Sequence, residues 1–120
     1  MSVIDTTKID FWEPHPGSRM RVIGNGEHVT LVYARLKPGS DVPEHKHPSE
    51  QMGVCLQGEA IFTINEKEFT VKEGFSWIIP EDTTHSMKIS EKEEFVSVEL
   101  FSPPRPDLLR REFAPDKLSG

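Results

Sequence analysis

Short segments of alternating hydrophobic and polar residues follow one another along most of this chain. Ala60, Phe62 and Ile64 fall on one face of such a segment, because side chains of an extended chain alternate with a period of two. No segment before residue 106 keeps the 3.6-residue period of an amphipathic helix. The pattern predicts an all-β protein with strands near residues 20–24, 28–36, 51–57, 59–65, 67–73, 74–80, 85–90 and 94–101.

Glycine and proline separate these segments at short intervals, as in β-sandwiches and β-barrels. Asn25-Gly26 predicts a tight hairpin, because both residues tolerate positive φ. The stretch PDLLRREF at 106–113 begins with proline and places an aspartate before its arginines, which is the order that a helix favours. We therefore expect at most a short C-terminal helix.

The 120-residue chain has the usual size of one domain. Its net charge of -6 argues against a nucleic-acid partner. Its apolar runs are too short to cross a bilayer, and its first residues do not resemble a signal peptide. Cys55 is the single cysteine, and in mid-strand we interpret it as a small core residue rather than a nucleophile. These features predict a cytoplasmic protein without a membrane partner.

His45 and His47 stand one residue apart. On a strand they would share a face and offer two imidazoles to one metal ion. The same spacing also fits solvent-facing histidines, so the pair alone does not decide between the two interpretations. A third histidine, His85, follows its own glycine and proline after the stretch GFSWIIPEDTT.

Two motifs in this region resemble those of the cupins, small antiparallel jelly-roll barrels that hold a metal ion. The first cupin motif contains a glycine, a His-x-His pair, an acidic residue and a second glycine. The corresponding residues here are Gly39, His45, His47, Gln51 in the acidic position, and Gly58. The second motif is matched by Gly74, Pro80 and His85, with Asp82 in place of a glycine and Ile89 in place of an asparagine.

The resemblance implies a single cupin domain over residues 1–120, with a barrel frame at about 20–105, an N-terminal arm at 1–18 and a C-terminal tail at 106–120. It further implies that one divalent transition metal ion is bound. Zinc, nickel, manganese, cobalt and iron all suit such a set of ligands. The implied metal ligands are His45, His47, Gln51 and His85.

Gln51 departs from the motif because its amide is neutral. A divalent ion there keeps its full charge, which favours Lewis-acid chemistry over the two-histidine, one-carboxylate site of iron oxygenases. Only Glu50 could restore the carboxylate. If Gln51 points inward, however, its neighbour Glu50 points outward into solvent.

The chain resembles most closely the pectin-degradation cupins, through the glutamine after His-x-His, the stretch GFSWIIP and the ending FSPPR. This resemblance implies ring opening of a 4,5-unsaturated uronate to the linear keto acid. It assigns proton transfer to Glu99 and the pocket floor to Phe101. Strand parity gives two conflicting interpretations, since an inward Glu99 turns the apolar residues Val96, Val98 and Leu100 outward.

A homodimer would allow Glu99 to point inward while the apolar residues of the same strand point outward, because the second subunit would cover the outward apolar face. The resemblance implies such a dimer, with a small sugar acid as substrate. Two alternatives stay open: a metal-dependent dioxygenase or polyketide-tailoring cupin with the same ligands, and a metal-containing module that binds a ligand without turnover. Trp77, in an apolar strand, is predicted to fill the core.

Overall fold

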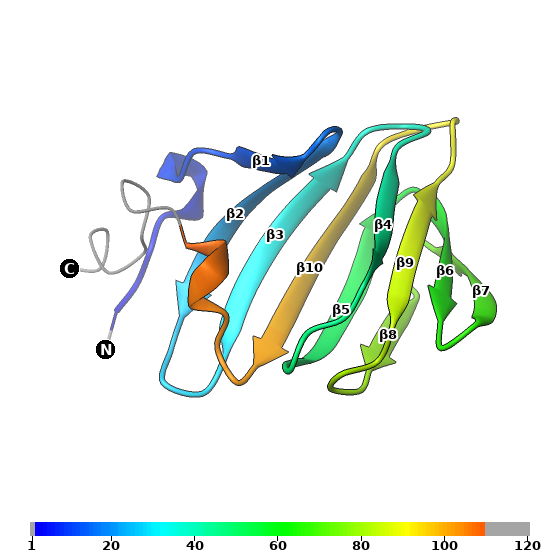
Figure 1. Ribbon diagram of the computed structural model, residues 1–120. Helices are drawn as coiled ribbons and strands as arrows, with labels where there is room; N and C mark the ends of the chain where they lie inside the picture. The colour runs from blue at the N-terminus through cyan, green and yellow to red at the C-terminus, as the bar shows by residue number, and fades with distance from the viewer. Residues whose placement is uncertain (1, 110–120) are drawn as a thin grey trace.

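The computed structural model describes residues 2–109, which form ten β-strands and two short 3-10 helices (Figure 1). The helices are η1 (Thr6–Lys8) and η2 (Pro106–Leu108). The strands are β1 (Trp12–His15), β2 (Ser18–Asn25), β3 (Thr30–Leu36), β4 (Asp41–His45), β5 (Glu50–Gln57), β6 (Glu59–Ile64), β7 (Lys67–Lys72), β8 (Ser76–Ile79), β9 (His85–Ile89) and β10 (Phe95–Ser102).

The strands form two antiparallel sheets that face each other. The larger sheet has the order β1-β2-β3-β10-β5-β8, and the smaller has the order β4-β9-β6-β7. Several consecutive strands belong to different sheets, so the chain crosses repeatedly from one layer to the other (Figure 1). This architecture is a cupin-like jelly roll, and the prediction of an all-β barrel is confirmed.

Each of the strands that the alternation pattern did not delimit, β1 and β4, contains a proline and lies at an edge of its sheet. Proline has no N–H to donate to a neighbouring strand, so it is tolerated mainly where one side of the strand is unpaired. Pro14 and Pro43 therefore mark edge strands. They also interrupt the alternation of hydrophobic and polar residues by which the other strands were predicted.

Two turns show how loop chemistry fixes strand pairing. The hairpin predicted at Asn25-Gly26 exists between β2 and β3, but the positive φ expected at its turn residues is wrong. Asn25 pairs with Thr30, the Gly26 N–H donates to the Val29 carbonyl at 2.8 Å, and neither Asn25 nor Gly26 has a positive φ. The two-residue turn with positive φ joins β6 to β7 instead, at Asn65 (49°) and Glu66 (70°).

Gly58 turns the chain from the larger sheet into the smaller one with a φ of 93°. A Cβ at this position would lie 2.5 Å from the Glu94 carbonyl oxygen. Both the backbone conformation and the close approach therefore require glycine, the residue that the cupin motif places here.

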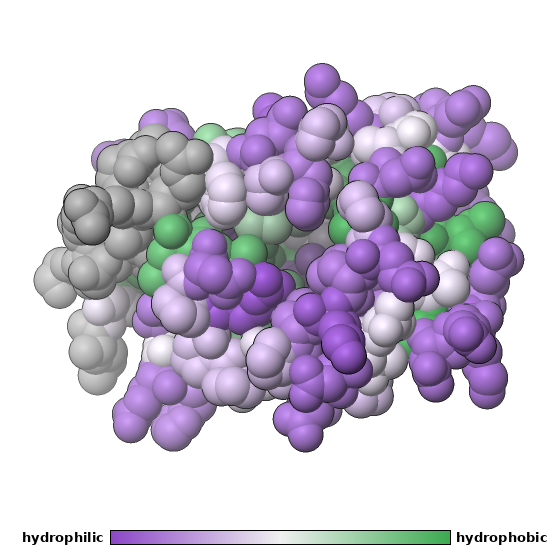
Figure 2. Space-filling model, viewed as in Figure 1, coloured by the Kyte–Doolittle hydropathy of each residue, from purple (hydrophilic) through white to green (hydrophobic). Residues whose placement is uncertain are grey.

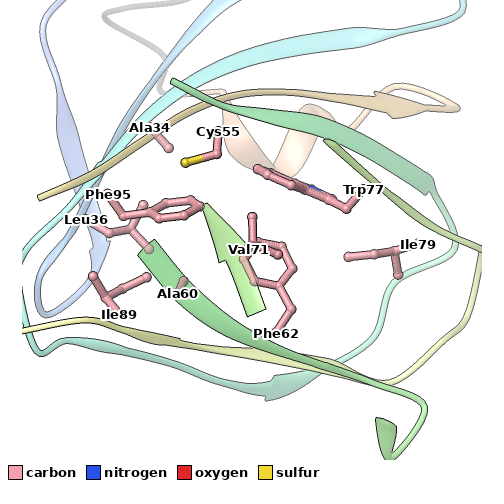
Figure 3. Close-up of a cluster of buried hydrophobic side chains, with 10 residues drawn as sticks. All are labelled: Ala34, Leu36, Cys55, Ala60, Phe62, Val71, Trp77, Ile79, Ile89 and Phe95. Carbon is pink, nitrogen blue, oxygen red and sulfur yellow. The ribbon is translucent and has the colours of Figure 1, made fainter. Parts of the chain in front are cut away.

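The larger of two hydrophobic clusters packs between the sheets (Figure 3), and a smaller one consists of Val22, Val32, Phe101 and Leu108. Cys55 lies in the larger cluster with 1% exposure, and Trp77 packs against Phe62 with ring centroids 4.7 Å apart. Both residues were predicted to be in the core, and both predictions are confirmed. The ten buried residues of this cluster are Ala34, Leu36, Cys55, Ala60, Phe62, Val71, Trp77, Ile79, Ile89 and Phe95.

The two ends of the chain differ from a simple arm and tail. Ile9 is buried, and β1 adds a strand to the larger sheet ahead of β2. At the other end, the helix predicted from Pro106 begins as η2, and residues 110–113 of that stretch lie outside the described residues. No helix within residues 2–109 is long and apolar enough to span a membrane.

Candidate metal centre

The proposed ligands come from three neighbouring segments at the end of the barrel away from the larger hydrophobic cluster: the end of β4 with the loop after it, the start of β5 and the start of β9. His45 ends β4 and pairs with His85, which begins β9, while Gln51 lies near the start of β5. His47 stands past the end of β4, in the loop before β5. The premise that His45 and His47 share a strand face is therefore wrong, although both rings reach the site.

The three imidazoles form a compact group. Their ligand atoms all lie within 4.8 Å of one another, and the His45 and His85 ring centroids are 4.3 Å apart. His47 and His85 are buried, whereas His45 is exposed. The arrangement places His45, His47 and His85 in position to bind a metal ion.

A backbone carbonyl fixes the tautomer of each histidine. The Nδ1 atoms lie 2.8 Å from the Pro43 oxygen for His45, 2.9 Å from the Ser49 oxygen for His47 and 2.8 Å from the Thr83 oxygen for His85. A carbonyl oxygen can only accept, so each Nδ1 donates and each Nε2 keeps a lone pair. This is the usual arrangement of metal-binding histidines.

The Nε2 of His85 is buried and has no hydrogen-bond partner among the described residues. Burial lowers the pKa of His85 to about 4 and also lowers the pKa of His45. Both rings are therefore neutral near neutral pH, the form that binds metal. A divalent ion would satisfy the orphaned lone pair, so the residues fit the metal that the sequence implies.

Gln51 adds a fourth candidate ligand through its amide oxygen. Its Oε1 lies 3.0 Å from the Nε2 of His47, and its Nε2 donates to the Glu99 carboxylate at 2.6 Å. The amide oxygen and the imidazole lone pair are both acceptors, so a cation between them would relieve their mutual repulsion. Gln51 is buried and Glu50 is exposed, so the carboxylate of Glu50 does not replace the amide.

Glu99 faces the interior. Its Oε1 accepts hydrogen bonds from the side chains of Gln51 and Trp77, the latter at 3.2 Å. Burial raises the pKa of the Glu99 carboxyl, although these hydrogen bonds oppose the rise. Of the two interpretations of strand parity, the structure therefore supports the inward Glu99, and Val98 and Leu100 lie on the outer face of β10.

A cavity of about 470 Å³ adjoins the histidines and is lined by Gln51, Glu99 and Phe101 among others. The Phe101 ring is buried and meets His47 edge-on, with centroids 5.5 Å apart. Phe101 therefore forms part of the cavity wall next to the histidines. Figure 2 shows the protein surface hollowed near the centre of the viewed face, among largely hydrophilic side chains.

Among the cavity residues that sequence reasoning missed are Arg105 and His15. The Arg105 guanidinium lies 5.0 Å from the centre of the Phe101 ring and is paired with Asp107 at 2.6 Å. The FSPPR stretch contained Arg105, but only the fold shows that its side chain turns back to the cavity. His15 ends β1, and the pairing of β1 with β2 brings it to the cavity wall.

Asp82 holds the second loop of the site in place. It has a φ of 53°, the conformation for which the cupin motif uses glycine, and aspartate tolerates it better than most residues. Its backbone N–H donates to the His47 carbonyl at 2.8 Å. This hydrogen bond ties the loop before β9 to the loop that contains His47.

Comparison with known proteins agrees with this geometry. The family model described as "Cupin domain" matches residues 32–101, a span that includes His45, His47, Gln51, His85 and Glu99. The chain belongs to the cupin family. Among solved structures, this cupin is similar to KdgF from Halomonas sp., at 23% identity and a TM-score of 0.82, covering 91% of this chain and 99% of that one.

Two further relatives carry other descriptions. The polyketide cyclase RemF from Streptomyces resistomycificus is 16% identical with a TM-score of 0.74, covering 98% of this cupin and 92% of that chain. The HTH-type transcriptional regulator PuuR of Escherichia coli is 30% identical over 74 residues, covering 58% of this cupin and 40% of PuuR. The chain thus spans less than half the length of this curated relative.

Proposed function

We propose that this cupin is a metal-dependent enzyme that opens the ring of a 4,5-unsaturated uronate to give the linear keto acid. The observation that carries the proposal is the placement of the Glu99 carboxylate. It lies in the cavity beside the histidines, and Gln51 joins it to them, with its amide oxygen toward His47 and its amide nitrogen on Glu99. The resemblance of GFSWIIP and FSPPR to the pectin-degradation cupins supports the choice of substrate.

The metal would be held by His45, His47, His85 and Gln51. When bound, a divalent ion supplies Lewis-acid polarisation of a substrate oxygen. Three neutral imidazoles and a neutral amide leave its charge uncancelled, which suits this role and needs no change of oxidation state. The reaction is an isomerisation, so it requires no oxidant.

In the proposed reaction, Glu99 moves one proton. The proton leaves the anomeric hydroxyl, the ring C–O bond at that carbon breaks, and the electron pair stays on the ring oxygen as an enolate. Carbon 4 of the former double bond then receives a proton, which completes the ketone. No described residue donates a hydrogen bond to the second oxygen of Glu99, Oε2, so this oxygen serves as the proton carrier.

Arg105 and Phe101 would bind and orient the sugar acid. Arg105 contributes a positive charge to the cavity wall and can bind the substrate carboxylate, for which the ion pair with Asp107 would have to rearrange. The Phe101 ring offers an apolar surface between Arg105 and His47 for the face of the sugar ring. Both contacts would hold the anomeric carbon near the histidines.

The test is the loss of ultraviolet absorbance of a 4,5-unsaturated galacturonate, corrected for its spontaneous decay. Native, chelator-stripped and metal-reloaded proteins are compared. Acceleration by the native and reloaded proteins only is the expected result. A fully metallated protein that gives no acceleration would contradict the proposal, and oxygen uptake by an iron-loaded sample would instead support a dioxygenase.

The second candidate function is ligand binding without turnover. Its support is the match to PuuR, a transcriptional regulator, over 58% of this chain. A module of this kind would bind a sugar acid in the same cavity, and the ligand would raise the melting temperature without being consumed. Measuring melting temperature and substrate concentration on one sample separates the two functions.

We further propose that the cupin is a cytoplasmic homodimer in which a second copy covers the outer face of the larger sheet. Leu31, Leu100, Met52 and Ile78 form one cross-strand row there, and Ile78 is 60% exposed. A row of apolar side chains across four strands favours burial against an identical row. Sedimentation should show a dimer that Ile78→Lys dissociates; a native monomer at all concentrations would contradict this assembly.

A further inference from the structure

Trp77 lies at the boundary between the hydrophobic core and the metal centre. Its ring packs against Phe62 and Phe95 in the core, with centroids 4.7 Å and 6.1 Å away (Figure 3). Its Nε1–H, however, donates to the Oε1 of Glu99 at 3.2 Å. One side chain therefore belongs to both regions.

The register of the larger sheet explains how the indole reaches Glu99. Trp77 of β8 pairs with Gly53 of β5, and Gly53 pairs with Glu99 of β10, so the three residues form one cross-strand row. Neighbouring strands are about 4.8 Å apart, so the outer two residues of the row are separated by roughly 10 Å of sheet. Only a long side chain that passes over the middle residue can bridge that distance.

Gly53 makes this passage possible. A Cβ on Gly53 would lie 2.4 Å from Cζ2 and 2.7 Å from Nε1 of Trp77, closer than non-bonded atoms approach. The indole thus rests directly on the backbone of β5. Any other residue at position 53 would push the Nε1–H away from Glu99.

We infer that Trp77, seated over Gly53, is a positioning residue that fixes the carboxylate of Glu99 for the proposed reaction. Trp77 of β8 and Gln51 of β5 donate to the same oxygen, Oε1, and both strands lie on the same side of β10 in the sheet. Two donors on one oxygen set the rotation of the carboxylate and direct Oε2 as the working oxygen. The role in turnover rests on the proposed function, but the hydrogen bond itself does not.

The first test is NMR of the zinc-loaded protein. The chain has two tryptophans, so Trp12→Phe identifies the indole N–H signal of Trp77. We expect this proton to be shifted downfield in the native protein and to move upfield in Glu99→Ala and, to a similar extent, in Gly53→Ala. An unchanged Trp77 signal in Glu99→Ala would overturn the inference. This measurement needs no substrate, so it decides the inference even if the uronate is not turned over.

The second test compares Trp77→Phe with Phe62→Leu, which removes packing from the same core cluster but no hydrogen bond to Glu99. Trp77→Phe should lower kcat about tenfold, with KM and zinc content unchanged, because one hydrogen bond to a charged group is lost. Phe62→Leu should lower the melting temperature but keep kcat. Equal losses of kcat in both variants would show that Trp77 acts only as a core residue.

Discussion

The two ends of the barrel interior are built from the same strands but have opposite chemistry. At the core end, β5, β9 and β10 contribute Cys55, Ile89 and Phe95, which pack without polar partners other than backbone. At the metal end, β5 and β9 contribute Gln51 and His85. The same strand thus contributes to both ends. The position of an inward residue along its strand decides whether the residue packs in the core or takes part in the chemistry of the site.

The metal end tolerates a cavity because its polar side chains form hydrogen bonds with one another and with the backbone. Each histidine is anchored by a carbonyl, and Gln51 links His47 to Glu99. Within residues 2–109, the core end depends instead on close packing of aromatic rings, and Trp77 links it to the network through Glu99. The two ends should therefore respond to mutation in separable ways.

The largest expected effect is that of His47→Ala. It removes a ligand from the centre of the metal site, so metal content and turnover should be lost together while the fold remains. Metal analysis, an activity assay and circular dichroism measure the three quantities. His28→Ala is the matched control, because His28 is exposed on the β2–β3 loop, with 85% of its side chain accessible. Full metal occupancy in His47→Ala would contradict the assignment.

A core substitution should lower the free energy of unfolding and leave the metal ligands in place. Phe62→Ala removes a side chain that is 1% exposed, and the expected loss is about 3–5 kcal/mol of unfolding free energy. Urea denaturation measures it. The control is its outward neighbour Ile61→Ala, at 41% exposure, for which the loss should be well under half as large. If the two variants were equally stable, the assignment of Phe62 to the stabilising core would be wrong.

Glu99→Gln separates metal binding from proton transfer within the metal end. The glutamine side chain has nearly the same shape as glutamate, but its amide cannot accept and release a proton near neutral pH. Turnover should therefore fall at least about tenfold. Metal content should stay at the native level. Glu50→Gln, on the exposed side of β5, is the control. Unchanged turnover in Glu99→Gln would remove Glu99 from the mechanism.

The smallest expected effect is the loss of stability on removing the ion pairs of Glu94 with Arg35 and Arg19. Arg35 at 2.6 Å, with Arg19, lowers the pKa of Glu94 below its ordinary value. Because the folded pKa is the lower one, the stabilisation is present above the unfolded pKa of about 4.5 and is lost as pH falls through the folded value. Glu94→Gln should cost less than about 1 kcal/mol at pH 7. Its deficit in urea denaturation should shrink as pH falls below the unfolded pKa, and a deficit that stays constant into acid would contradict the pairing.

Local pattern was enough to predict most strands, and the cupin resemblance pointed to the three histidines that the structure brings together. Alternation such as that of Ala60, Phe62 and Ile64 reports directly on one buried face, and the spacing of the cupin motifs singles out the histidines from sequence alone. The edge strands β1 and β4 were not delimited, because Pro14 and Pro43 break the period. Their positions depend on pairing with distant strands, which a local window does not contain.

The orientation of side chains at the site could not be predicted for the same reason. Parity left Glu99 undecided, since both faces of β10 carry apolar residues. The passage of Trp77 over Gly53 depends on three strands whose order in the sheet differs from their order in sequence. A glycine in the middle of a predicted strand was the available signal, because it often marks a close approach of another group.

Anomalous diffraction from a crystal of the metal-loaded protein tests the central claim most directly. The account predicts one ion peak at the end of the barrel away from the core, bound by His45, His47, His85 and the Gln51 oxygen, with Glu99 nearby but not a ligand. A peak elsewhere, or one bound by Glu99 or Glu50, would contradict the account.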